Sequence, residues 1–120
     1  MKWVYVFLGG GMGSLLRFAL GNLLAPLAML FPWATLLANA LAAVIIACLF
    51  ASGARTENEE LWCLVAVGFC GGLSTFSTFS METVQLVRSG HNLLAWSYVL
   101  LSVFLSLILF YCIVQLYQRA

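Results

Sequence analysis

One segment differs in composition from the apolar sequence around it, and it reads Gly68-Phe69-Cys70-Gly71-Gly72-Leu73-Ser74-Thr75-Phe76-Ser77-Thr78-Phe79-Ser80. It lies inside an apolar stretch long enough to cross a bilayer, yet seven of its residues from Gly71 to Ser80 are Gly, Ser or Thr. Backbone groups freed in hydrocarbon must be satisfied within protein or along a cavity. The segment therefore predicts a polar pathway, and the chain is a candidate channel or transporter.

The composition of the whole chain is typical of an integral membrane protein. Of its 120 residues, 64% are hydrophobic and 8% are charged, and the mean hydropathy is +1.07. Soluble domains carry about 25% charged residues. The net charge of +1 indicates no basic surface for nucleic acid. The four cysteines lie in apolar segments without metal-ligand spacing, so we expect them to be packing residues.

Four apolar segments are each close to the roughly 20 residues that a membrane-spanning helix needs. We expect spans over about residues 3–24, 35–52, 61–87 and 93–117, within one transmembrane domain over residues 1–120. The sequence thus predicts an all-α membrane protein with four transmembrane helices.

The distribution of basic residues favours neither orientation of the chain in the membrane strongly. With four spans, Lys2, Arg55 and Arg119 share one side of the membrane, and Arg88 lies on the other, where we expect Arg17 to join it. Because orientation follows Lys and Arg near span ends, a balance of three to two permits insertion in both directions. Two opposed copies would then form an antiparallel, dual-topology homodimer, whereas a weak but sufficient bias would give one orientation.

One copy is also too small to enclose a pore, which favours an oligomer. Small residues spaced four apart permit close contact between membrane helices. Three such pairs occur: Gly9 with Gly13, Gly10 with Ser14, and Gly68 with Gly72.

Two phenylalanines are the main candidates for lining a pathway. Phe76 and Phe79 are three residues apart, so they share a helical face, and hydroxyl residues surround them. The edge of an aromatic ring is positive and can face a small anion, and nearby hydroxyls can donate to the same ion without trapping it. The alternative is that both rings only pack or face lipid.

The glycines of the same segment predict an interruption of the third helix. Gly71 and Gly72, followed by Ser74, are poor residues for a helix interior, which favours a break over a simple kink. Broken spans direct helix ends and unwound carbonyls toward ions near the membrane midplane.

Other polar groups occur within the spans. Asn39 is either a pore residue or a hydrogen bond between helices, and its residue type leaves both open. A stripe on the fourth span is either a polar track or a set of hydroxyls bonded to the preceding turn: Tyr98, Ser102 and Ser106. Glu82 lies near a span end. No nucleophile–base pair, paired carboxylates or phosphate loop supports an enzyme.

Residues 68–82 resemble the signature of the Fluc fluoride channels, also called the CrcB family. Gly9-Gly10-Gly11-Met12-Gly13-Ser14-Leu15-Leu16-Arg17 resembles the first helix of that family, and Thr35-Leu36-Leu37-Ala38-Asn39 resembles its second-helix motif. The sequence departs from the family pattern at Ala34, where Gly is usual, and at Ser74, where Thr is usual.

This resemblance implies a dual-topology homodimer in the prokaryotic plasma or inner membrane, with two fluoride pathways. It also implies a structural sodium ion at the dimer centre, held by the main-chain carbonyls of Gly71 and Ser74. The pathway residues implied are Phe76, Phe79, Asn39, Ser77, Thr78, Tyr98, Ser102, Ser106 and Glu82. The implied function is passive export of fluoride, because hydrogen fluoride enters neutral, ionises in the more alkaline cytoplasm and is trapped there.

Two other function classes remain. A small multidrug-resistance-type exporter is also a four-helix, dual-topology protein, but it needs a membrane-embedded carboxylate, for which Glu82 is the one candidate. A non-conducting assembly subunit would leave the run of hydroxyls and phenylalanines unexplained.

Overall fold

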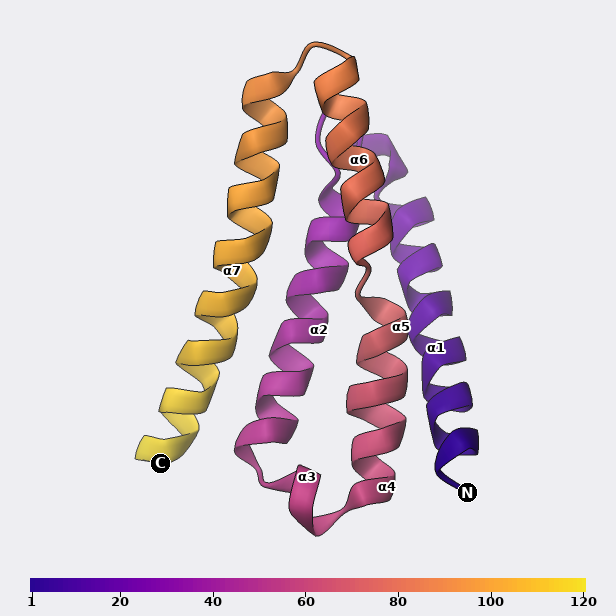
Figure 1. The fold of residues 1–120 in the computed structure, drawn as a ribbon, viewed down its shortest axis with the longest axis vertical. Coiled ribbons are helices and arrows are strands. Elements are labelled where there is room, and N and C mark those ends of the chain that lie inside the picture. The colour runs from indigo at the N-terminus through magenta and orange to yellow at the C-terminus, as the bar shows by residue number, and fades with distance from the viewer.

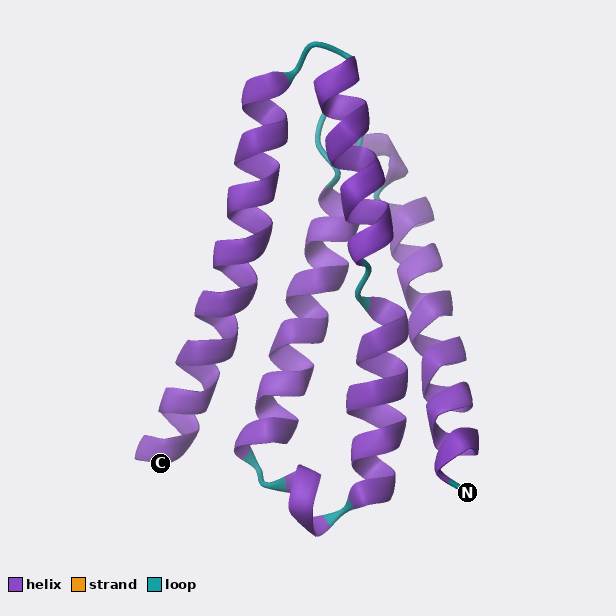
Figure 2. Ribbon diagram, viewed as in Figure 1, coloured by secondary structure: helices purple, strands orange, loops and turns teal.

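The computed structural model describes residues Met1 to Ala120 and is entirely helical (Figure 2). Four helices are long and apolar enough to cross a membrane: Lys2–Leu23 (α1), Trp33–Ala51 (α2), the interrupted span Glu59–Arg88, and Asn92–Arg119 (α7). This confirms the predicted all-α architecture with four spans. Both termini lie at one end of the molecule, and the turn before α7 lies at the other (Figure 1).

Short elements join and subdivide the spans. A 3₁₀ turn, η1 (Ala25–Leu27), follows α1, and α3 (Ala54–Glu57) connects the second and third spans. The third span consists of α4 (Glu59–Leu61), the π-helical segment η2 (Trp62–Cys70), α5 (Gly71–Leu73) and α6 (Phe76–Arg88).

The break in the third span lies at Ser74 and Thr75, both of which are extended. Their φ/ψ angles are −74°/153° and −152°/120°. The predicted interruption of the third helix is confirmed, but it begins at Ser74, because Gly71 and Gly72 are themselves helical. Gly72 has a packing role instead, since a Cβ there would collide with the carbonyl oxygen of Gly10 in α1.

Side chains on both sides of the break cap the helix ends that it creates. The Ser74 hydroxyl donates to the carbonyl of Cys70 at 2.8 Å and occupies part of the end of α5. The Thr75 hydroxyl accepts from the backbone N–H of Thr78 at 3.2 Å, which caps the first turn of α6. The break thus satisfies part of its exposed backbone locally.

Glycines on α1 bring that helix into backbone contact with the third span. Gly9 and Gly13 are buried, and a Cβ on either would collide with a carbonyl oxygen of η2, that of Leu64 or Phe69 respectively. The small-residue pairs of α1 and of the third span therefore act within one copy. They explain how these two spans pack against each other, so they are not evidence for an oligomer.

Arg17 does not point to the end of the molecule where Arg88 lies. Its Nε atom donates to the carbonyl of Gly72 at 3.0 Å, beside the break. Three basic residues therefore lie at one end of the molecule and one at the other, where the sequence predicts three and two. The difference between the two ends is larger than the sequence predicts, although it remains two residues.

The interior of one copy is small. Fifteen of the 120 residues are buried, and the central cluster consists of Ala38, Ala42, Cys70 and Leu73. Most large apolar side chains are exposed, including Phe76 at 80%. Such a surface requires lipid or a protein partner to cover it.

Candidate functional site

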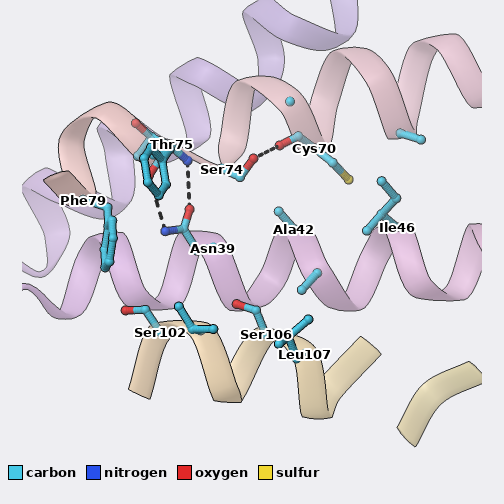
Figure 3. Close-up of a pocket in the computed structure, with 15 residues that line it drawn as sticks. Asn39, Ala42, Ile46, Cys70, Ser74, Thr75, Phe79, Ser102, Ser106 and Leu107 are labelled. Carbon is cyan, nitrogen blue, oxygen red and sulfur yellow. Dashed lines mark hydrogen bonds between the residues drawn. The ribbon is translucent and has the colours of Figure 1, made fainter. Parts of the chain in front are cut away.

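A cavity of about 540 Å³ lies beside the break, between α2, the third span and α7 (Figure 3). Several predicted pathway residues line it together: Asn39, Phe76, Phe79, Ser102 and Ser106. The predicted cation residues Gly71 and Ser74 line it as well. The structure thus brings residues from three different spans to one place.

Asn39 holds the break against α2 through both ends of its amide. Its Oδ1 accepts from the backbone N–H of Thr75 at 2.8 Å, and its Nδ2 donates to the carbonyl of the same residue at 3.5 Å (Figure 3). The amide therefore satisfies both backbone groups of the extended Thr75, as a neighbouring strand would in a β-sheet. In this arrangement Asn39 both bonds between helices and lines the cavity, so the two alternatives from the sequence do not exclude each other.

The two phenylalanines form a row with Tyr98. The ring centroids of Phe76 and Phe79 are 5.6 Å apart, and those of Phe79 and Tyr98 are 5.0 Å apart. Both pairs are tilted, as is usual for aromatic contacts. The row leads from the exposed Phe76 to the fully buried Tyr98.

Glu82 accepts hydrogen bonds at both carboxylate oxygens. Thr35 of α2 donates to Oε1 and Tyr98 of α7 donates to Oε2, each at 2.8 Å. The carboxylate therefore joins three spans at a part-buried position. A charged group inside the membrane with such partners is expected to face a polar path.

The hydroxyls of α7 do not all behave alike. Ser97 donates to the carbonyl of Leu93, one turn earlier, and such a bond satisfies the hydroxyl within its own helix. The Ser102 Oγ is buried and has no hydrogen-bond partner, and Ser102 lines the cavity one turn beyond Tyr98. Buried hydroxyls are almost always paired in folded proteins, so Ser102 is equipped to bind something that enters the cavity.

Four predicted pathway residues do not line this cavity: Ser77, Thr78, Tyr98 and Glu82. Ser77 is exposed, and its hydroxyl is 3.3 Å from that of Thr75. Thr78 accepts from the Thr75 hydroxyl at 3.2 Å. Thr78 and Glu82 line a second cavity of about 550 Å³, on the side of α6 that faces α1 and Arg17.

The main-chain carbonyls of Gly71 and Ser74 accept no hydrogen bond from any group of the chain. Their neighbours differ, because the Cys70 carbonyl accepts from Ser74 and the Gly72 carbonyl accepts from Arg17. Unpaired carbonyls at the end of a broken membrane helix are suitable ligands for a hard monovalent cation. These two residues therefore fit the main-chain site that the family resemblance implies.

Sequence reasoning missed three residues of the site. Thr75 accepts and donates hydrogen bonds with Asn39 and caps α6, and Thr35 donates a hydrogen bond to Glu82. The ring centroid of Phe31 lies 5.4 Å from that of Tyr98. One signal was available for Thr35, which is four residues before Asn39 and thus on the same face of α2.

Comparison with known proteins identifies the group to which the chain belongs. A family described as "CrcB-like protein, Camphor Resistance (CrcB)" matches residues 4–114. The chain is 43% identical over 106 residues to a fluoride-specific ion channel FluC of Serratia proteamaculans, covering 87% of this chain and 84% of that protein. It is 46% identical over 105 residues to the FluC protein of an Escherichia coli strain, covering 86% and 80% respectively. With most of its length matched and a site assembled at the break, this chain belongs to the CrcB family.

Proposed function

We propose that the chain is a fluoride-specific ion channel, which lets cytoplasmic fluoride leave the cell passively, down its electrochemical gradient. The observation that carries this proposal is Ser102, whose hydroxyl is buried and unpaired and which lines a cavity together with Phe76 and Phe79. A free hydroxyl beside ring edges offers a dehydrated anion weak, reversible contacts. The names of the FluC relatives support the same function.

The proposed pathway enters the cavity beside the break and passes the two phenylalanines. It then follows Ser106, Ser102 and Tyr98 along α7 and ends beside Glu82. Asn39 shapes the path by holding the break, and Ser77 and Thr78 provide hydroxyls near one end of it. None of these groups is a fixed positive charge, so an ion that enters can also leave.

The chain is a multi-pass membrane protein of a channel family, which sets it apart from enzymes. The FluC relatives are bacterial, so we place it in the plasma or inner membrane of a prokaryote. The alternative of a proton-coupled exporter is disfavoured, because both oxygens of Glu82 are bonded to hydroxyls rather than open to a cationic drug.

The test is fluoride efflux from liposomes in the absence of a pH gradient, measured with a fluoride electrode. We expect rapid efflux of fluoride and retention of chloride. Ser102→Ala should slow fluoride efflux about tenfold without loss of assembly, whereas the matched control Ser97→Ala should conduct like the parent. A parent chain that releases fluoride only with a pH gradient would overturn the proposal in favour of coupled transport.

We further propose that two copies pair as an antiparallel homodimer with two pathways. The exposed Phe76, the cavity open beside the break and the small interior of one copy all favour a second copy as cover. A difference of two basic residues between the ends is small enough to permit both orientations. Reporter fusions at the C-terminus should give signal on both sides of the membrane, and a single orientation without a partner protein would contradict this.

The proposed cofactor is a structural sodium ion at the dimer centre. Gly71 and Ser74 of both copies would hold it through their unpaired main-chain carbonyls, where it would bind the two broken helices together. Ser74→Ala should leave the sodium-dependent thermal stability of the dimer intact, whereas Gly71→Val should abolish the dimer. Replacing sodium by N-methylglucamine should lower the melting temperature of the parent. The opposite pattern in the two variants would place the site elsewhere.

A further inference from the structure

The buried ring of Tyr98 contacts one phenylalanine from each of two cavities. Phe79 lines the cavity beside the break, and its ring centroid is 5.0 Å from that of Tyr98. Phe31 lines a different cavity of about 290 Å³, and its centroid is 5.4 Å from Tyr98, with the rings at 81°. Tyr98 itself is fully buried and lines neither cavity. It therefore acts as the partition between them.

The small cavity lies where the proposed pathway reaches Glu82. Its wall is made of the connector between α1 and α2, including Phe31 and Pro32, and of polar side chains on and after α6: Glu82, Gln85, Ser89 and His91. The turn between α6 and α7 lies at the end of the molecule opposite to both termini (Figure 1). The cavity thus connects the Tyr98–Glu82 pair with that end.

We propose that Phe31 is a third aromatic residue of the fluoride pathway, forming its mouth with Tyr98 and Glu82. This inference rests on the proposed fluoride channel. It extends the row of rings from Phe76 and Phe79 through Tyr98 to the connector, so that an anion meets an aromatic ring on both sides of the Tyr98 partition. The connector between α1 and α2 then has a part in permeation rather than serving only as a link.

The chemistry at Glu82 explains why a ring is needed there. A carboxylate at the mouth repels an approaching anion, and the hydroxyls of Thr35 and Tyr98 that bond to it are no longer free to donate to fluoride. The positive edge of an aromatic ring offsets part of this repulsion without holding the ion as a lysine would. Phe31 lines the small cavity together with Glu82, and the other aromatic ring in its wall is the imidazole of His91 in the turn after α6.

The first experiment compares efflux rates of variants at matched amounts of assembled protein. We expect Phe31→Leu, which keeps apolar bulk, to slow fluoride efflux at least tenfold, and Phe31→Tyr, which keeps the ring, to stay within about threefold of the parent. The matched control is Trp33→Leu. The ring centroid of Trp33 is 4.6 Å from that of Phe31, but Trp33 lines none of the three cavities. Parent-like efflux in Phe31→Leu, or equal slowing in Phe31→Leu and Trp33→Leu, would overturn the inference.

A second measurement does not depend on removing bulk from the mouth. In a background with its native cysteines replaced by alanine, Phe31→Cys is treated with methanethiosulfonate reagents of either charge. We expect the anionic ethylsulfonate to slow efflux at least fivefold more than the cationic ethylammonium. Leu27→Cys, on the same connector and outside the three cavities, should respond equally to both.

Equal effects of the two reagents at Phe31→Cys would show that this position lies outside the ion path. Failure of the proposed function and failure of the role of Phe31 give different results in these experiments. A parent chain without fluoride efflux contradicts the proposed function, whereas a conducting parent with an indifferent Phe31 contradicts only this inference.

Discussion

Arg17 of α1 donates a hydrogen bond from Nε to the main-chain carbonyl of Gly72, at a distance of 3.0 Å across 55 residues of sequence. The bond reaches the helix end that the break exposes, where carbonyls lack partners within their own helix. Gly13 makes this possible, since it lies one turn before Arg17 on the same face and is packed against the carbonyl of Phe69. Because Gly13 has no side chain, the two spans lie close together, and the side chain of Arg17 can reach the Gly72 carbonyl.

The first prediction concerns this bond. Arg17→Met keeps the length of the side chain but leaves the Gly72 carbonyl without a donor, so we expect the free energy of unfolding to fall by about 1.5–3 kcal/mol. The measurement is a denaturant titration in detergent micelles. The control is Arg88→Met, because Arg88 is exposed and makes no hydrogen bond or ion pair, and it should change stability by less than about 0.5 kcal/mol. Equal losses in the two variants would assign the effect to charge alone.

The close contact between α1 and η2 gives a second prediction. Gly13→Ala places a Cβ against the Phe69 carbonyl and must push the helices apart, which we expect to destabilise the fold by about 1–3 kcal/mol. Gly11→Ala is the matched control, since a Cβ there meets nothing within 4 Å and alanine favours the helix. The same titration compares both variants, and a Gly13→Ala protein as stable as Gly11→Ala would contradict the packing seen here.

The spans followed from local properties of the sequence, whereas the position of the break did not. Helix propensity marked Gly71 and Gly72 as the weak point, but Gly72 is held in a helix by its contact with α1. The extended backbone at Thr75 is instead fixed by Asn39, which is 36 residues away. Propensity describes a segment by itself, and here tertiary contacts move the break by a few residues.

The site shows the same division between local and distant information. The hydroxyl-rich run and the Phe76–Phe79 spacing could be recognised because they lie within one helix. The bond between Thr35 and Glu82 joins residues 47 apart, and the position of Phe31 depends on a connector without regular periodicity. Such partners become visible only when the spans are packed together.

A third prediction tests the role of Asn39 in the break. Asn39→Asp keeps an acceptor for the Thr75 N–H, which is the shorter of the two bonds at 2.8 Å, so we expect the protein to fold and assemble. The added negative charge would lie in the wall of the cavity, where it should slow fluoride efflux by well over tenfold. Asn39→Ala should instead destabilise the fold by about 1–3 kcal/mol, because the Thr75 N–H loses its partner.

Efflux from liposomes and unfolding in detergent separate these two effects of Asn39. An Asn39→Asp protein that conducts like the parent would place the ion path away from this amide. An Asn39→Ala protein of unchanged stability would mean that Thr75 finds another partner.

The last prediction assigns the rings of Phe76 and Phe79 to permeation rather than folding. Phe76 is 80% exposed and Phe79 lines the cavity beside Tyr98, so neither is a core residue of one copy. Replacing either by Ile keeps apolar bulk and removes the positive ring edge that faces a dehydrated anion. Fluoride efflux should therefore slow by well over tenfold, which corresponds to about 1.4 kcal/mol or more in the barrier.

The measurement uses liposomes that hold matched amounts of protein, with assembly checked by size-exclusion chromatography. Phe50→Ile is the matched control, because Phe50 pairs with Phe110 at the far end of α2 and α7, away from the cavity, and it should conduct at the parent rate. Parent-like rates in Phe76→Ile and Phe79→Ile would reduce both rings to packing. The path would then have to run along Asn39 and the hydroxyls of α7, where the unpaired Ser102 marks the next place to test.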